Sequence, residues 1–216
     1  MDVVIEFFKH LLDPDWIMKN GGLYLVLLIL FIETGVFFGF LLPGDPLLFI
    51  SGMVIASVNE AHYPFSSAML NLPFWMLLFM ASTIVGNYFG YWFGKKFKFL
   101  IDRPEGTWFL KRKHIDTAHA FYEKRGGLTI LIARFLPIIR TFAPIIAGTV
   151  KMDYKKFAFY NIAGAILWVG SLTSLGYILG DNVWVKKNLE YVMLGIIVIV
   201  TTPVIIKLFV KKEKLA

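Results

Sequence analysis

The sequence predicts an all-α polytopic membrane protein with two Pro-broken re-entrant helical hairpins of opposite orientation. About three full transmembrane helices and an N-terminal amphipathic helix complete the expected fold. Of the 216 residues, 57% are hydrophobic, and the mean hydropathy of +0.67 is too high for an ordinary soluble domain. Some apolar stretches of bilayer length carry no charge, whereas prolines and charged residues interrupt two others.

The N-terminal residues 1–19 are expected to form an amphipathic helix that lies along the membrane interface. A helix with one apolar face can lie in this position. Apolar residues recur here at helical spacing, at Val3, Val4, Phe7, Phe8, Leu11 and Leu12. A short soluble helix that packs on the rest of the chain is the alternative.

The first long apolar segment, residues 20–58, is predicted to be a re-entrant hairpin. Its only charged residues are Glu33 and Asp45. A strong turn signal near its middle should break the helix, at Pro43-Gly44-Asp45-Pro46. Two full spans in place of one hairpin are the alternative.

The distribution of basic residues predicts the orientation of the chain in the membrane. Residues 95–125 are rich in Lys and Arg, and residues 59–71 contain neither. By the positive-inside rule, the first loop is expected in the cytoplasm and the second outside. The segment 72–94 then forms a transmembrane helix between them, and 157–180 and 189–208 form two more.

The second hairpin is predicted over residues 127–150, which contain Arg134 and Arg140. Lysines flank this segment on both sides, so both of its ends are expected in the cytoplasm. Pro137 and Pro144 should break a continuous helix near the middle. A single Pro-kinked span is the alternative, since about 24 residues at 1.5 Å each are long enough to cross the bilayer.

All these elements are expected to belong to one membrane domain, residues 1–216, with two halves of inverted topology. Each half contains a hairpin followed by a long span, and the two hairpins enter from opposite faces. Transporters built from inverted repeats with broken helices hold their site near the midplane of the bilayer. The pattern therefore predicts a site at that depth, bearing the charged residues of both hairpins.

Four charged residues within the apolar segments carry the predicted chemistry. An ionised side chain that faces lipid is costly, so these four are expected to face one another or water. Arginine presents a planar fork of donors that suits phosphate, so Arg134 and Arg140 are candidate ligands of a phosphate group. A carboxyl that is both desolvated and close to an arginine can exchange a proton near neutral pH. Glu33 and Asp45 are therefore candidate proton carriers. The structural alternative is that an acid pairs with an arginine and only fixes the two hairpins together.

Small, amide and tryptophan residues within the apolar segments are interpreted as packing and anchoring residues. Gly86, Gly90 and Gly94 repeat every four residues, a pattern that permits close helix approach. Asn87 lies beside this face and can form a hydrogen bond, and Asn161 is expected to form a structural one. The tryptophans expected to anchor the membrane interface are Trp16, Trp75, Trp168 and Trp184.

Three motifs in the same order resemble the DedA family of bacterial inner-membrane proteins. They are FIETGVFFGFLLPGDPLLFISG, GNYFGYWFGKK, and RFLPIIRTFAPIIAG followed by YNIAGAILW. The resemblance covers residues 20–180 and implies a fold of paired re-entrant hairpins of opposite orientation. It also implies a bacterial cytoplasmic membrane protein that flips undecaprenyl phosphate, a carrier lipid, in dependence on the proton motive force.

The resemblance further implies which residues are functional. The family's functional acids fall on Glu33 and Asp45, and its functional arginines fall on Arg134 and Arg140. The sequence departs from the family pattern at Pro46, where a small polar residue is common, and at Gly39, which replaces a proline. All four charges are nevertheless present.

The resulting interpretation is a transporter without cofactor or metal, and not an enzyme. Its expected partners are a polyprenyl phosphate or another anionic lipid, protons and the membrane, and homodimer formation is left open. Nucleic acid is not expected, because the net charge of +7 is assigned to membrane orientation. A lipid-phosphate phosphatase is the enzymatic alternative, but the four histidines lie outside the apolar segments. A membrane scaffold or a carrier of another ion or solute is the third hypothesis.

Overall fold

A computed structural model describes residues 20–36, 39, 42–57, 64–96, 127–180 and 182–189, with isolated positions at 10, 16, 191–192, 194–195, 198 and 202. Every regular element within these residues is a helix. The expected amphipathic helix over 1–19, the basic loop beyond residue 96 and most of the span over 189–208 lie outside the described residues.

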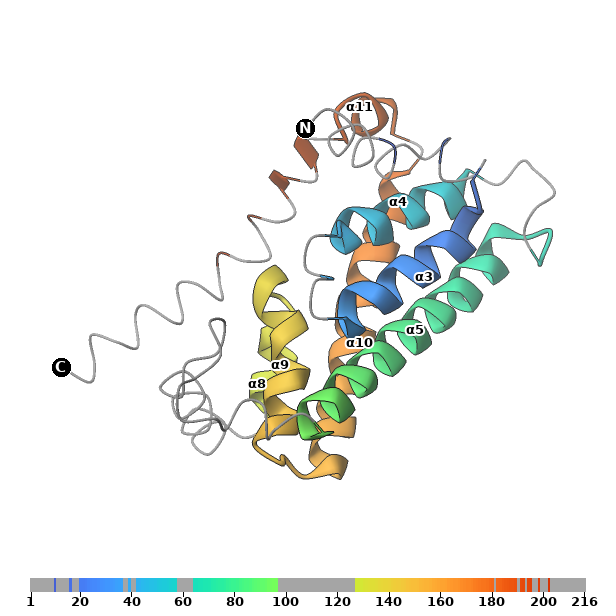
Figure 1. The fold of residues 1–216 in the computed structure, drawn as a ribbon. Coiled ribbons are helices and arrows are strands. Elements are labelled where there is room, and N and C mark those ends of the chain that lie inside the picture. Colours follow the sequence, from blue (N-terminus) through green and yellow to red (C-terminus); the bar gives the residue numbers. More distant parts are fainter. Residues whose placement is uncertain are drawn as a thin grey trace. The chain divides into compact units, whose positions relative to one another are not determined.

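The described helices form two compact units. The helices are α3 (Gly22–Gly35), α4 (Gly44–Ala56), α5 (Ala68–Lys96), α8 (Leu128–Ala133), α9 (Pro137–Thr149), α10 (Tyr154–Leu179) and α11 (Val183–Lys187) (Figure 1). Unit 1 comprises residues 1–30, 42–82 and 167–216, and unit 2 comprises residues 31–41 and 83–166. Helices α3, α5 and α10 therefore each contribute residues to both units.

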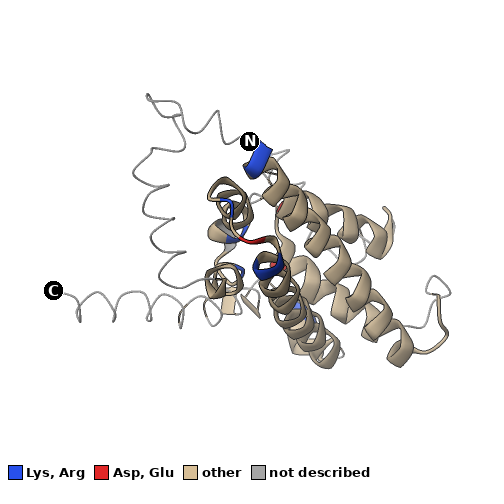
Figure 2. Ribbon diagram, turned by 90° about the horizontal axis from the view of Figure 1, so that it is seen from below, with Lys and Arg blue, Asp and Glu red and all other residues tan. Residues whose placement is uncertain are grey.

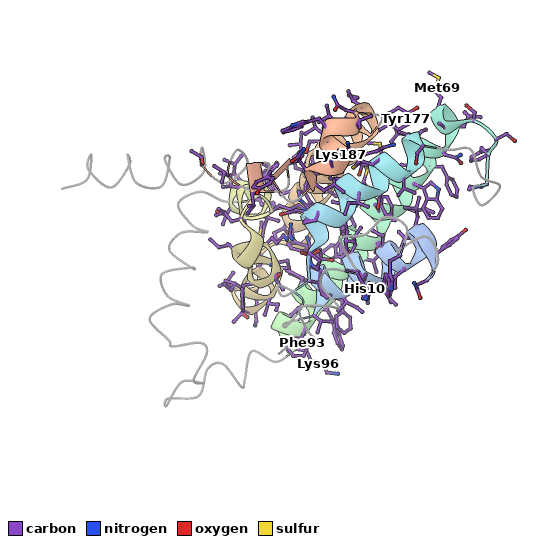
Figure 3. The ribbon with its side chains drawn as sticks, turned by 90° about the horizontal axis from the view of Figure 1, so that it is seen from above. His10, Met69, Phe93, Lys96, Tyr177 and Lys187 are labelled. Carbon is purple, nitrogen blue, oxygen red and sulfur yellow. The ribbon has the colours of Figure 1, made fainter. Side chains whose placement is uncertain are left out.

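Helices α5 and α10 are long and apolar enough to cross a membrane. They contain 29 and 26 residues, whereas about 20 suffice to cross the hydrocarbon core. Both helices expose large apolar side chains, which on α5 include Met69, Leu77, Val85 and Trp92. Figure 2 shows few charged residues along the described helices, and Figure 3 shows Met69 and Lys96 at opposite ends of α5. An apolar surface of this extent suits contact with lipid.

The core of unit 1 lies where α3 and α4, which run beside each other (Figure 1), pack on parts of α5 and α10. It contains Leu30, Leu47 and Phe79 together with two tryptophans, Trp75 and Trp168. Both tryptophans are 1% exposed. The expectation that these two anchor the membrane interface is therefore wrong, because their rings fill the core instead.

The core of unit 2 lies between the α8–α9 pair, the C-terminal part of α5 and the N-terminal part of α10. Its buried side chains include Tyr91, Ala133, Ala147 and Phe157. The hydroxyl of Tyr91 donates a hydrogen bond to the carbonyl oxygen of Met152 at 2.6 Å, just before α10 begins. The tyrosine thus joins α5 to the segment between α9 and α10.

Two glycines allow α4 and α10 to meet backbone to backbone in unit 1. A side chain at Gly52 would overlap the carbonyl oxygen of Thr173, and a side chain at Gly176 would overlap that of Phe49. The two contacts are reciprocal, because Gly52 lies three residues after Phe49 and Gly176 lies three residues after Thr173. Only a residue without Cβ permits so close a crossing.

The same reciprocal contact joins α9 and α5 in unit 2. A side chain at Gly148 would overlap the carbonyl oxygen of Tyr91, and a side chain at Gly94 would overlap that of Ile145. Here too, Gly148 lies three residues after Ile145, and Gly94 lies three residues after Tyr91. The second helix of each predicted hairpin thus crosses a long helix through the same kind of glycine contact.

The other glycines of the α5 pattern also lie in close contacts, so its predicted packing role is confirmed. Side chains added at Gly86 and Gly90 would meet Thr34 and Pro144, respectively. In this way α5 is held against both α3 and α9 within unit 2.

The prolines and glycine of the predicted breaks lie at or near helix starts, with one exception. Pro43 directly precedes α4, Gly44 is its first residue, and Pro46 lies in the first turn, where no intrahelical N–H donor is needed. Pro137 is the first residue of α9. Pro144 differs from the expected break, because it lies inside α9 and the helix continues to Thr149. One proline removes one backbone hydrogen bond, and α9 nevertheless continues because a single loss does not end a helix that is packed closely on α5.

Candidate functional site

Glu33 and Arg140 form a buried ion pair in unit 2. Glu33 lies in the last turn of α3 and Arg140 in the first turn of α9, and their side chains are 0% and 5% exposed. The Nη2 group of Arg140 donates to Oε1 of Glu33. The hydroxyl of Thr141 adds a hydrogen bond to the backbone carbonyl of Glu33 at 3.3 Å. The structure therefore brings together one predicted acid and one predicted arginine that are 107 positions apart in the chain.

Each charge of this pair lies at the helix end that favours the opposite charge. The C-terminus of a helix carries a partial negative charge and the N-terminus a partial positive charge. Glu33 is close to the C-terminus of α3, and Arg140 is close to the N-terminus of α9. Each charge is therefore stabilised by the opposite charge of the pair and not by its own helix. The start of α9 carries two positive contributions, the guanidinium of Arg140 and the N-terminal end of the helix.

Close contact between α3 and α5 positions Glu33. A Cβ atom on Gly35 would come within 3.1 Å of the carbonyl oxygen of Gly86, and a Cβ atom on Gly86 would overlap the hydroxyl of Thr34. Because both positions are glycine, the end of α3 lies directly against the backbone of α5. A larger residue at either position would move Glu33 relative to Arg140.

Arg134 lies in the same unit and is held by an asparagine of α10. It follows the last residue of α8 and is 3% exposed. Its Nη1 group donates to the backbone oxygen of Asn161 at 2.6 Å and to the side-chain oxygen of the same residue at 3.2 Å. Arg134 is also close enough to Arg140 for the two positive charges to repel each other.

A second asparagine completes this amide cluster. Asn161 is 0% exposed, and its Nδ2 group donates to the carbonyl oxygen of Ile84 at 3.2 Å. Asn87 donates from Nδ2 to Oδ1 of Asn161 at 2.8 Å. With its amide turned over, Asn87 instead accepts from Nη2 of Arg134 at 3.3 Å and donates to the carbonyl oxygen of Thr34 at 3.3 Å. In that orientation one amide links Arg134 to the residue next to Glu33.

Asp45, the fourth predicted site residue, belongs to unit 1. It lies in the first turn of α4, where a carboxylate favourably faces the positive end of the helix. Its Oδ1 atom accepts a hydrogen bond from the indole Nε1 of Trp168 at 2.7 Å. Asp45 thus accepts a hydrogen bond from an indole, and Glu33 accepts one from an arginine.

Sequence reasoning did not assign a site role to Trp168, Asn161 or Asn87. An interface position was expected for Trp168, and Asn161 was expected to form only a structural hydrogen bond. The signal that pointed to the two asparagines was their occurrence in uncharged segments of bilayer length, where an amide needs a partner. Nothing in the sequence indicated that the partner is Arg134.

Comparisons with known proteins show the family to which the chain belongs. A family model described as the VTT domain matches residues 25–178, which include the four charged residues and most or all of each helix from α3 to α10. The chain belongs to the VTT domain family, the DedA family. Its predicted resemblance to this family is confirmed.

Several relatives extend over most of this DedA-family chain. Protein DedA of Escherichia coli strain K12 is 40% identical over 220 residues, which cover 100% of this chain and 95% of that protein. Uncharacterized membrane protein ML0287 of Mycobacterium leprae is 35% identical over 214 residues, covering 95% and 90%. Inner membrane protein YqjA of Escherichia coli strain K12 is 33% identical over 182 residues, covering 81% and 74%. No solved structure matches the chain. Because the chain belongs to this family and has two helices long enough to span a bilayer, it is a membrane protein.

Proposed function

We propose that this DedA-family protein is a multi-pass lipid transporter that moves undecaprenyl phosphate, or a similar polyprenyl phosphate, across the bacterial cytoplasmic membrane. Transport is coupled to protons, and the protein is not an enzyme. The observation that carries the proposal is the buried pair of Glu33 and Arg140, with a second buried arginine, Arg134, in the same unit. Charged side chains that are buried this deeply within a membrane protein typically mark a pathway for ions or charged substrates.

The proposed topology has two re-entrant hairpins, α3–α4 and α8–α9, that enter from opposite faces. Helices α3, α4 and α9 contain 14, 13 and 13 residues, fewer than the roughly 20 that a full span needs. Helices α5 and α10 are full spans. The repeated glycine crossing in the two units supports this proposal, because inverted repeats are built from two copies of one packing arrangement.

In this proposal the lipid phosphate takes the place of the Glu33 carboxylate on Arg140. A phosphate offers more oxygens than a carboxylate and suits the planar fork of a guanidinium. The N-terminal end of α9 adds a positive field at the same place. Arg134 contributes the second positive charge, and the isoprenoid tail remains in the lipid.

Protonation of Glu33 links this exchange to the proton gradient. A proton on Glu33 removes the negative charge that attracts Arg140, so the guanidinium becomes available to the phosphate. Binding of the headgroup thus favours uptake of a proton, and the two are carried together. Asp45, which faces the neutral indole of Trp168, is the second proton carrier in this proposal.

A structural clamp is the second candidate function, because the same ion pair is also what a clamp requires. In that case Glu33 and Arg140 hold α3 to α9, and lipid phosphate has no effect on the pair. Buried ion pairs are poor stabilisers once desolvation is counted, which favours the transporter.

Flipping of undecaprenyl phosphate by the purified protein in liposomes tests the proposal. We expect flipping that increases with an imposed pH gradient. It should fall at least about tenfold in Arg140→Lys, which keeps the charge but loses the bidentate fork. Lys155→Arg, a change outside the site, is the matched control and should flip normally. The proposal is contradicted if undecaprenyl phosphate stays in its original leaflet in liposomes that contain wild-type protein and an imposed pH gradient.

A further inference from the structure

Three helix ends meet at one end of unit 2, and they carry a group of exposed lysines. These ends are the C-termini of α5 and α9 and the N-terminus of α10 (Figure 1). The bond from Tyr91 to the carbonyl oxygen of Met152 joins two of them. A Cβ atom on Gly148 would lie 2.8 Å from the backbone nitrogen of Lys95, so α9 also lies against α5. The exposed lysines here, termed the lysine surface, are Lys95, Lys96, Lys151, Lys155 and Lys156.

Lys151 has a backbone conformation that favours glycine. Its φ angle is 52°, in the left-handed region. Helix α9 ends in a Schellman motif, in which the N–H of Lys151 donates to the carbonyl oxygen of Gly148 and that of Met152 donates to Ala147. This motif places a left-handed residue directly after the helix, and it is usually glycine because a Cβ atom is unfavourable there. The lysine at this position therefore lowers the stability of the fold.

Two further lysines occupy positions that helix electrostatics disfavours. Lys155 and Lys156 lie in the first turn of α10, where the partial positive charge of the helix end repels a cation. Asp153 precedes this helix, and its carboxylate accepts a hydrogen bond from the backbone N–H of Lys156 at 2.9 Å, as a capping residue does. Lysines at positions where the backbone or the helix dipole disfavours them indicate that their charge has a use other than folding.

Exposed aromatic side chains adjoin the lysine surface. Trp92 is 50% exposed and Tyr154 is 57% exposed. The Nζ atom of Lys96 lies 4.8 Å from the centre of the Trp92 ring. Tryptophan and tyrosine beside lysine are typical of the depth at which lipid headgroups meet the hydrocarbon core. Because α5 and α10 are both long enough to span a bilayer, their ends are expected at this depth.

We infer that the lysine surface binds the headgroups of anionic phospholipids in the leaflet at this end of unit 2. The lysines attract the phosphate groups, and each lysine near an anionic membrane surface adds to that attraction. The rings of Trp92 and Tyr154 suit the apolar part of a lipid, which favours a lipid over a soluble polyanion. The inference does not depend on transport of undecaprenyl phosphate, because it concerns exposed residues and not the buried pair of Glu33 and Arg140.

The variant Lys151→Gly tests the inference, because it should change stability and lipid binding in opposite directions. Glycine adopts the left-handed conformation freely, so the apparent unfolding temperature of the purified protein in detergent should rise by about 2–4 °C. Binding is measured with fluorescent phosphatidylglycerol, which is anionic, and fluorescent phosphatidylcholine, which has no net charge. Loss of one lysine should lower the ratio of the two affinities about fivefold. A lysine that only ends the helix would leave this ratio unchanged.

Matched variants separate the charge from the backbone conformation. Lys151→Ala removes the same charge but keeps a Cβ atom, so it should lose the preference for phosphatidylglycerol without any gain in stability. Lys151→Arg keeps the charge and should keep the preference. Lys187→Ala removes an exposed lysine from the last turn of α11 in unit 1, and should leave the preference unchanged. Changing Lys155 and Lys156 together to alanine should lower the preference more than Lys151→Ala does.

The preference should also weaken as salt is added, because salt screens exposed charges. Equal affinity of the wild-type protein for the two lipids overturns the inference, and so does a wild-type preference in both Lys151→Ala and the double variant. Binding of inorganic polyphosphate through these lysines, with no preference for phosphatidylglycerol, overturns it in favour of a soluble polyanion. None of these results bears on the proposed transport, which the flipping of undecaprenyl phosphate tests separately.

Discussion

Replacing Glu33 with glutamine should destabilise the protein, and neutralising Arg140 should repair the loss while neutralising Arg134 should not. Glutamine has nearly the shape of glutamate but carries no charge, so the guanidinium of Arg140 stays buried and loses the carboxylate to which it is bonded. The structure assigns Glu33 to Arg140 and places Arg134 on Asn161. Sequence alone left both arginines as partners of Glu33.

The magnitude of the effect follows from the burial of the pair. The side chains of Glu33 and Arg140 are 0% and 5% exposed, so solvent screens neither charge, and breaking such a pair costs about 3–5 kcal/mol. Glutamine keeps an oxygen that accepts a hydrogen bond from Arg140, so we expect the lower end, about 3 kcal/mol. That loss lowers the apparent unfolding temperature by about 6–12 °C.

Thermal unfolding of the purified variants measures this prediction. Glu33→Gln should unfold early, Glu33→Gln with Arg140→Gln should recover most of the loss, and Glu33→Gln with Arg134→Gln should not. Undecaprenyl phosphate should also stabilise Glu33→Gln, because its phosphate takes the place of the missing carboxylate, whereas undecaprenol should not. Equal rescue by both arginine variants would refute the assigned pairing. Rescue by Arg140→Gln without any effect of the phosphate lipid would support the clamp over the transporter.

Three further predictions concern unit 1 and its helix crossing. Asp45→Asn keeps an oxygen that accepts from Trp168 but cannot carry a proton, so flipping in liposomes should lose its response to a pH gradient; an intact response would exclude Asp45 as a proton carrier. Trp168→Phe replaces the indole with a smaller ring and removes the donor to Asp45, so unfolding should show a loss of about 1–3 kcal/mol from the hydrogen bond and the packing together, and a variant as stable as wild type would contradict this contact. Gly52→Ala should destabilise the protein by about 1–3 kcal/mol, because its methyl group would overlap the backbone of α10. Gly170→Ala is its control, and equal stability of the two variants would contradict the close crossing.

The spanning helices and the buried charges could be predicted from the sequence because the bilayer imposes strong constraints. The uncharged segments 72–94 and 157–180 lie within α5 and α10, apart from the last residue of the second. Glu33 and Arg140 lie in apolar sequence, where an ionised group needs a partner, and the structure joins them. The glycine pattern of α5 predicted packing because small residues at helical spacing have few other uses in a membrane helix.

The specific partners could not be predicted, because they depend on tertiary contacts that no local pattern encodes. Asp45 is an acid in the same predicted hairpin as Glu33, and it accepts a hydrogen bond from the indole of Trp168, which no pattern in the sequence indicated. Trp168 resembled an interface anchor because tryptophan is common there, but its ring fills the core of unit 1. Pro144 was expected to break a helix, yet α9 continues through it. In each case the packing of another helix outweighed the local preference.

The central claim is that a lipid phosphate replaces Glu33 on Arg140 while Glu33 takes up a proton. Its most direct test is to measure proton uptake during binding, by calorimetric titration of the purified protein with undecaprenyl phosphate in buffers of different ionisation enthalpy. The account predicts that wild-type protein takes up close to one proton from the buffer for each phosphate lipid bound near neutral pH, and none with undecaprenol. Binding of undecaprenyl phosphate with no proton uptake would contradict it.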